Sequence, residues 1–338
     1  MKKIVLVTHN GIGNLGGVER VCYYLNVILS AKFRIEILAK PNVSFGKLNI
    51  LVFSLIDTLK LLFQRNKFVI SNSWQLFSYS SDLSIHHGTT KGCIKHIPGF
   101  NCFSAMVISF LEKISAKKAK HILSVSKNCT EELINLYGIP SCKITTLNNF
   151  VDGNLFYPKK ERKVNKECVI CFSGRICTRK GLDSLLKLSE YIEKVDGVKL
   201  LIACNDKQNI ELFSENKKTE IRTGLSINDM NDFYNLGDIF YFPTLYEGFS
   251  MSTLEALSCG LPVLGTKFAI PDEIAHYDFC KRTEDLSPSE IVDTAINLRN
   301  QFKNKRVEIH EIVDRDFGKN QYSDKLFNLI LNLQGVKN

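Results

Sequence analysis

The chain has 338 residues and a formal net charge of +9, with 44% hydrophobic and 23% charged residues. This length fits two ordinary domains, each able to bury its own core, and the composition is typical of a soluble globular protein. The eleven cysteines follow no disulfide-framework spacing and lack the second close pair of a zinc site. They exclude a disulfide-rich or zinc-finger scaffold and favour a reducing cytosol.

The first half of the chain alternates between short apolar runs and longer amphipathic stretches. Strands are predicted at residues 3–7, 33–39, 68–71, 82–87, 121–125 and 144–147, and helices at residues 18–30, 50–63, 104–119 and 130–137. This alternation is typical of a parallel sheet that helices cover on both faces. The opening apolar run is too short for a signal peptide, and polar residues interrupt the tract at 50–63, so we expect no membrane span.

The positive charge is concentrated in residues 1–150, whereas the remainder of the chain is slightly acidic. Basic residues follow the apolar stretches at 50–63 and 106–111. This pattern predicts attraction to an anionic partner, either an anionic membrane surface or a phosphorylated acceptor. The alternative is that these stretches are ordinary core helices with solvated basic faces.

A glycine loop follows the first predicted strand. Its spacing, Gly11-x-Gly13-x-x-Gly16, and its position before a helix match a dinucleotide-binding fingerprint. A dinucleotide site also needs an acidic residue at the end of the second strand, but that strand ends in Ala39-Lys40. An NAD(P)-dependent oxidoreductase therefore remains as the alternative function.

The strand that begins at Asp82 ends in two histidines, His86 and His87. A side chain at the carboxyl end of a strand in an α/β protein faces the crevice where ligands bind. We therefore take His87 as a candidate site residue, with a satisfied core histidine as the alternative. Strand alternation places His86 on the other face, where we expect a structural role.

The second half repeats the strand–helix alternation after a polar segment at residues 158–163, which is the best linker candidate. Strands are predicted at residues 169–173, 199–203, 239–242 and 263–264, and helices at residues 182–195, 227–236, 251–258, 291–301 and 317–333. A second parallel sheet is therefore expected.

Cations flank the turn after the first of these strands. Arg175 and Lys180 stand on either side of the turn, directly before a helix. Two cations at a helix N-terminus can hold a diphosphate and stabilise its charge as a bond to it breaks. Ordinary surface cations are the alternative. Arg179, between them, is not assigned a role.

Two carboxylates, Glu247 and Glu255, are separated by seven residues between a strand and a short helix. We expect Glu247 in the loop and Glu255 on the first helical turn. Two acceptors for sugar hydroxyls beside a helix N-terminus, which attracts anions, suit a nucleotide-sugar donor. Alternatively, Ser252-x-x-Glu255 is a capping box that needs no ligand.

The spacing Glu-Gly-Phe-Ser-x4-Glu from Glu247 to Glu255, with Pro262-Val263 behind it, resembles the donor-site signature of the retaining glycosyltransferase family 4 enzymes. The resemblance covers nearly the whole chain and is strongest at residues 172–273. It implies the α/β GT-B fold, with two facing Rossmann-like domains and an interdomain cleft. The first domain would comprise residues 1–153 with a returning helix at about 317–335, and the second, donor-binding domain residues 154–316.

The resemblance also implies roles for single residues. Glu247 would lie against the donor sugar and Glu255 would hold the ribose, while Arg175 and Lys180 would neutralise the leaving diphosphate without a metal ion. His87 would contact the sugar from the other domain, so the catalytic set is Glu247, His87, Arg175 and Lys180. The donor-binding set is Gly16, Gly17, Arg175, Lys180, Gly224, Leu225, Glu247, Gly248, Phe249, Ser250, Met251 and Glu255.

The implied function is retaining transfer of a hexose-type sugar from a nucleotide-diphosphate donor, with a UDP-sugar expected. The acceptor would be a glycan or a lipid-linked molecule in polysaccharide, lipopolysaccharide or capsule synthesis. The resemblance implies no cofactor, no metal and no nucleic-acid partner. It implies a cytoplasmic enzyme that can bind peripherally to the inner face of the cytoplasmic membrane.

Overall fold

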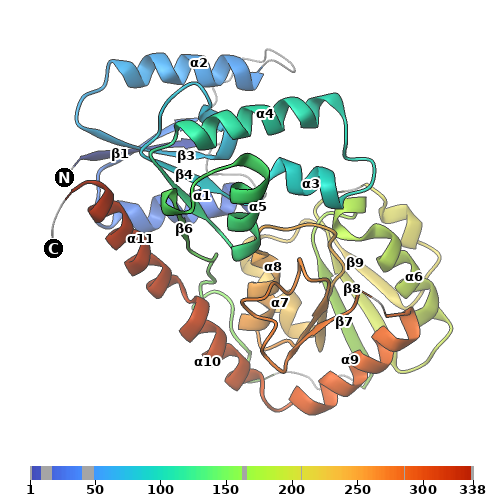
Figure 1. The fold of residues 1–338 in the computed structure, drawn as a ribbon. Coiled ribbons are helices and arrows are strands. Elements are labelled where there is room, and N and C mark those ends of the chain that lie inside the picture. The colour runs from blue at the N-terminus through green and yellow to red at the C-terminus, as the bar shows by residue number, and fades with distance from the viewer. Residues whose placement is uncertain are drawn as a thin grey trace. The chain divides into compact units, whose positions relative to one another are not determined.

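The computed structural model describes residues 2–8, 17–39, 49–161, 166–206, 208–284 and 286–335 (Figure 1). The chain forms two compact units. The first comprises Met1–Lys95, Gly99–Asn148 and Tyr322–Asn338, and the second comprises His96–Pro98 and Asn149–Gln321. The expected domain limits at residues 153 and 317 differ from these divisions by a few residues.

The first unit contains a six-stranded sheet with the order β2-β1-β3-β4-β5-β6, and its described strand pairs are all parallel. Its elements are β1 (Lys3–Thr8), α1 (Gly17–Ser30), β2 (Ile35–Ala39), α2 (Asn49–Leu62), β3 (Lys67–Asn72), the 3₁₀ turn η2 (Ser73–Leu76), β4 (Leu83–His86), α3 (Thr90–His96), α4 (Phe103–Lys118), β5 (His121–Ser124), α5 (Lys127–Tyr137), η3 (Ser141–Lys143), β6 (Ile144–Thr146) and, from Tyr322 on, α11 (Lys319–Leu333).

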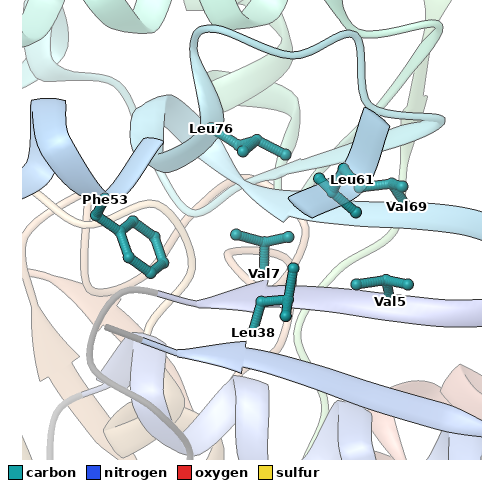
Figure 2. Packing of buried hydrophobic residues seen from close by; sticks show 7 residues of the cluster. All are labelled: Val5, Val7, Leu38, Phe53, Leu61, Val69 and Leu76. Atoms are coloured by element: carbon teal, nitrogen blue, oxygen red, sulfur yellow. The ribbon is translucent and has the colours of Figure 1, made fainter. Parts of the chain in front are cut away.

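The core of this unit forms where α2 packs on the sheet (Figure 2). The cluster joins strand residues to the inner side of α2 and η2, namely Val5, Val7, Leu38, Phe53, Leu61, Val69 and Leu76. Phe53 and Leu61 are eight residues apart and therefore share one helix face. Burying such a side chain stabilises the fold by about 1.5–3 kcal/mol.

The second unit contains a six-stranded sheet with the order β12-β11-β10-β7-β8-β9, again parallel in its described pairs. Its elements are β7 (Cys168–Ser173), η4 (Thr178–Lys180), α6 (Leu182–Glu193), β8 (Val198–Ala203), η5 (Ile210–Phe213), β9 (Thr219–Arg222), α7 (Ile227–Leu236), β10 (Ile239–Phe242), α8 (Met251–Ser258), β11 (Val263–Gly265), β12 (Cys280–Arg282), α9 (Pro288–Phe302) and α10 (Arg306–Phe317).

The strand orders place a binding position in each unit. In an α/β sheet, ligands bind beyond the carboxyl ends of the strands at the point where the strand order reverses. In the second sheet this point lies between β7 and β10, and in the first it lies between β1 and β3. The loops that follow β7 and β10 are those that carry the predicted cations and Glu247.

The predicted parallel α/β organisation is confirmed, but four of the α-helices and strands in the described ranges had no counterpart in the sequence pattern: α3, β9, β12 and α10. The prediction of one terminal helix from residue 317 was wrong at its start. Phe317 ends α10, and α11 begins at Lys319. Gly318 separates the two helices in an extended conformation, with φ of −67° and ψ of 149°.

Candidate active site

The loops after β7 and β10 meet at a glycine. Gly181 has a left-handed φ of +85°, and a Cβ atom built on it would lie 2.2 Å from the carbonyl oxygen of Pro243. Only a residue without a side chain allows this approach. The contact holds η4, with its two cations, against the loop that contains Glu247.

The Glu247 carboxylate is the centre of the resulting cluster. Its Oε1 atom lies 2.7 Å from Nη1 of Arg179 and 2.6 Å from Nζ of Lys180. The Thr244 hydroxyl lies 3.2 Å from the same oxygen. The ammonium of Lys180 also stacks over the ring of Phe242, 4.6 Å from its centroid. One carboxylate oxygen therefore faces two cations at the switch point of the second sheet.

The cations control the charge of Glu247. Burial disfavours the carboxylate, but Lys180 and Arg179 outweigh it, so the pKa of Glu247 lies below its ordinary value. Burial in turn lowers the pKa of Lys180 below its ordinary value, against the opposing effect of Glu247. A charged group stays ionised in a half-buried position when an opposite charge lies within about 4 Å. In this cluster Glu247 can accept a hydrogen bond from a sugar hydroxyl, and the cations can bind a phosphate.

Arg175 is not part of this cluster. Its side chain is exposed and has no hydrogen bond or ion pair within the described ranges, although the turn beside it is anchored by the Asn209 amide, which donates to the Ile176 carbonyl at 2.7 Å. The structure thus brings together Lys180 and Glu247 from the predicted set and adds Arg179. The adjacent Arg179-Lys180 pair directly before Gly181 is the sequence signal that could have identified it.

Glu255 lies on the second turn of α8 and is 1% exposed. The Tyr234 hydroxyl lies 3.1 Å from Oε2 of Glu255 and 2.8 Å from the hydroxyl of Ser173, at the end of β7. The interpretation of Ser252 and Glu255 as a capping box is wrong. Ser250 caps α8, because its hydroxyl accepts the Thr253 N–H at 3.1 Å.

The start of α8 contains the remaining donor-loop candidates. Gly248, Phe249 and Ser250 lie between β10 and α8, and Met251 is the first residue of the helix. The Asn149 side-chain amide donates to the Phe249 carbonyl at 2.8 Å and holds this loop. The first amides of a helix have no carbonyl partner within it and can bind an anion.

The loop after β9 contains Gly224 and Leu225. Gly224 is exposed with a left-handed φ of +72°, and no described atom within 4 Å restricts a Cβ there. The Leu225 carbonyl accepts a hydrogen bond from the Asn205 side chain, which follows β8, at 3.1 Å. These residues lie at the same carboxyl edge of the second sheet as the Glu247 cluster.

His87 follows β4 in the first unit and is half-buried. Its Nε2 atom lies 3.2 Å from Oδ1 of Asn72, whose amide nitrogen donates to the Val7 carbonyl at 3.2 Å. Because Oδ1 can only accept, Nε2 of His87 is the protonated nitrogen. Burial and the neighbouring His86 lower the pKa of His87 to about 4, so its imidazole is neutral near pH 7.

The remaining residues of the first unit that the sequence singled out are Gly16, Gly17 and His86. Gly16 and the glycine loop around it lie outside the described residues, and Gly17 is the first residue of α1. His86 is fully buried, with Nε2 3.2 Å from the Ser84 hydroxyl and Nδ1 3.8 Å from Glu112.

Each unit is built on a parallel α/β sheet, which is the architecture of the GT-B fold. Residues 154–300 match the family model described as Glycosyl transferases group 1, so the chain contains a domain of this family. Over 277 residues the chain is 24% identical to a component of the human phosphatidylinositol N-acetylglucosaminyltransferase, covering 78% of this chain and 55% of the relative. It is 26% identical over 173 residues to the O-antigen chain mannosyltransferase RfbU of Salmonella typhimurium, covering 49% of this chain and 47% of the relative.

The solved structure of Anabaena Alr3699/HepE in complex with UDP and glucose has the same fold, with a TM-score of 0.73 and 12% identity over 98% of this chain and 100% of that one. This likeness confirms the predicted GT-B fold, and the family model supports the predicted family over residues 154–300. The chain spans about half the length of the curated relatives that it matches. The oxidoreductase alternative gains no support from these comparisons.

Proposed function

We propose that the protein is a retaining glycosyltransferase that moves a hexose-type sugar from a UDP-sugar to a glycan or lipid-linked acceptor. The observation that carries this proposal is the contact of Glu247 with Lys180 and Arg179 at the switch point of the second sheet. A carboxylate for sugar hydroxyls and cations for a diphosphate are the two chemistries that a nucleotide-sugar donor requires. The relatives named for phosphatidylinositol and for O-antigen support the acceptor class.

The proposed reaction breaks the bond between the anomeric carbon and the donor phosphate oxygen. A bond forms from the same carbon to the acceptor hydroxyl oxygen, and the hydroxyl proton passes to the leaving phosphate oxygen. Lys180, with Arg175 from the same loop, would neutralise the diphosphate in place of a metal ion. Glu255 would hold the ribose, and the neutral His87 would contact the sugar. Retention is tested by NMR of the product, since an inverted anomeric configuration would exclude it.

UDP and UDP-sugars are expected to raise the melting temperature of the protein. The HepE structure with UDP supports this choice of base. Ligand at a hundred times its Kd stabilises the folded state by about 2.7 kcal/mol, which is a shift of a few degrees. A thermal-shift panel of UDP, GDP, their sugars and NAD measures base and sugar together. A shift with NAD alone would contradict the proposal.

We also propose that the first unit binds an anionic membrane. Helices α2 and α4 both pack on η2 and lie along the same side of the first sheet (Figure 1), so their outer faces point the same way. Exposed apolar residues occupy both outer faces, and Phe103 on α4 is 79% exposed. None of the helices in the described ranges has the length and apolarity to cross a bilayer. On these two helices and the residue that follows α2, the described apolar side chains that are more than half exposed are Leu55, Leu59, Leu62, Phe63, Phe103, Met106 and Phe110.

The outer face of α4 combines apolar and basic residues in one stripe. Met106, Phe110, Lys113 and Lys117 follow one another at intervals of three or four residues and therefore share a face. Apolar side chains that enter the lipid headgroup region beside lysines that meet anionic lipid are the features of an interfacial helix. Such a surface would bring the enzyme to a lipid-linked acceptor, which lies in the membrane.

The Phe103→Ser/Phe110→Ser variant is expected to bind vesicles of phosphatidylglycerol and phosphatidylethanolamine about tenfold or more weakly than the wild type. Co-sedimentation measures this, and Val307→Ser is the matched control, because Val307 is 60% exposed on α10 of the second unit. Added salt should also weaken binding. Equal sedimentation of all three proteins, or wild-type binding that depends on neither anionic lipid nor salt, would contradict a membrane surface here.

A further inference from the structure

Arg179 both donates hydrogen bonds to the loop that holds Glu247 and accepts hydrogen bonds from it. Its Nη1 atom lies 2.7 Å from Oε1 of Glu247 and donates to the Tyr246 carbonyl at 3.2 Å. Its own carbonyl accepts the Leu245 N–H at 2.8 Å and the Thr244 hydroxyl at 3.0 Å. Every residue from Thr244 to Glu247 therefore bonds to Arg179, which joins this loop to the turn after β7.

Lys180 differs from Arg179 in one respect that matters for a donor. Its ammonium contacts Glu247 at 2.6 Å and the Phe242 ring, but no hydrogen bond from it to the backbone is found among the described residues. An ammonium is a compact point charge on a flexible stem, whereas a guanidinium makes several bonds in a fixed geometry. Lys180 can turn toward a phosphate, while Arg179 is fixed to the loop.

We propose that Arg179 is the positioning residue of the donor site, holding the Glu247 carboxylate in place and charged while Lys180 turns from Glu247 to the donor diphosphate. This inference rests on the proposed function and deepens it. Without Arg179, Lys180 would be the remaining cation against Glu247, and the donor phosphate would compete with Glu247 for it. With Arg179 bound to Glu247, Lys180 is available for the diphosphate, because one lysine cannot bind the carboxylate and the diphosphate at once.

The charged groups that face Glu247 predict how its titration depends on Arg179. Lys180 and Arg179, both on η4, lower the pKa of Glu247, as does the hydroxyl of Thr244 from its own loop, while the Cys177 thiol acts on Lys180. Removal of Arg179 should therefore raise the pKa of Glu247. The acid limb of kcat/KM reports groups of the free enzyme, so this limb should move to higher pH.

The test compares Arg179→Gln and Arg179→Lys with Arg282→Gln. Arg282 is a matched control in the same unit, because it also pairs with a carboxylate, Asp272 at 2.5 Å, and donates to a backbone carbonyl, that of Ile270 at 3.0 Å. We expect Arg179→Gln to lower kcat/KM for the donor about tenfold to a hundredfold, as loss of a charge-assisted hydrogen bond does. The acid limb of its kcat/KM profile should move to higher pH, and in Arg179→Lys the limb should return to its wild-type position.

The outcomes separate positioning from simple stabilisation. The inference is overturned if the activity of Arg179→Gln stays within threefold of the wild type. It is also overturned if Arg179→Gln loses activity while its acid limb does not move and its melting temperature falls further than that of Arg282→Gln. A wild type that no nucleotide sugar saturates would instead contradict the proposed function. In that case, ¹³C NMR of the Glu247 carboxyl still tests Arg179, because it follows the pKa without turnover.

Discussion

Replacing Gly181 with alanine is expected to destabilise the second unit by about 3 kcal/mol and to lower kcat/KM for the donor about a hundredfold. The new Cβ would lie 2.2 Å from the Pro243 carbonyl oxygen and 2.7 Å from its ring, neither of which can rotate away. Strain in a left-handed residue and overpacking each cost about 1–3 kcal/mol. Relief of the clash must move η4 and the Glu247 loop apart, and a displacement of about 1 Å can cost a hundredfold in rate.

Gly197→Ala is the matched control for this prediction. Gly197 belongs to the same unit and has a left-handed φ of +79°, but no described atom lies within 4 Å of the position that a Cβ would take there. Its replacement should cost only the backbone term, about 1 kcal/mol, and leave activity unchanged. Thermal unfolding and donor kinetics measure both variants. Equal destabilisation by the two replacements would show that the clash with Pro243 adds nothing to the effect of Gly181→Ala.

The fold was predictable because the signals that encode it are local. Apolar runs bounded by turn residues and amphipathic stretches follow one another closely enough to indicate both parallel sheets. The elements that the pattern missed are short or weakly patterned. Strands β9 and β12 span Thr219–Arg222 and Cys280–Arg282 and expose charged side chains, and α10 buries only Ile309 and Val313. Their positions depend on the sheet edge and the neighbouring helices.

The site was predictable only in part, for a different reason. Sequence spacing singled out Lys180 and Glu247, which the structure places in contact, but it could not show which arginine contacts the same carboxylate. Arg179 meets Glu247 across 68 positions of sequence, through the approach of two loops at Gly181. Arg175 has the more familiar spacing but ends on the exposed side of its turn. Long-range contact, which no local pattern encodes, decides which of the two arginines contacts Glu247.

The cap of α8 shows the same limit at shorter range. Ser250 and Ser252 can both cap a helix, and the Ser-x-x-Glu spacing favours the wrong one. The helix begins at Met251, so Glu255 moves to the second turn and points inward to Tyr234. Buried in this way, Glu255 needs its hydrogen bonds to stay satisfied. The first residue of the helix, which the Ser-x-x-Glu spacing does not encode, therefore determines both the cap and the contact of Glu255.

The Glu112→Gln variant is expected to lose about 3–5 kcal/mol of stability in the first unit. Glu112 is buried on α4 and accepts bonds from the Ser73 hydroxyl at 2.6 Å, the Thr90 N–H at 2.7 Å and the Tyr137 hydroxyl. Burial disfavours its charge, but His86 and these donors outweigh it and lower the pKa of Glu112. A glutamine amide would direct its own N–H group at one of the donors, and breaking a buried charged network costs about 3–5 kcal/mol.

Glu112 is also expected to affect His87 through Ser73. Ser73 has a left-handed φ of +45°, which strains a residue with a side chain, and its carbonyl accepts the Ser115 hydroxyl at 2.6 Å. Because Ser73 follows Asn72, the partner of His87, release of Ser73 should change the His87 imidazole signals in ¹⁵N NMR. The depressed pKa of Glu112 means that its stabilisation is present above the ordinary carboxyl range and is lost as pH falls through the folded-state value.

Urea unfolding followed by circular dichroism, at neutral and acidic pH, measures this prediction, with Glu131→Gln as the control on exposed α5 surface. The Glu112→Gln deficit should be largest at neutral pH and should shrink in acid, where the wild-type carboxylate is itself protonated. A deficit that does not depend on pH would mean that shape, not charge, holds this network. Unchanged His87 signals would show that Glu112 does not affect the histidine. Contacts other than those of Glu112 would then hold Ser73 in its left-handed conformation.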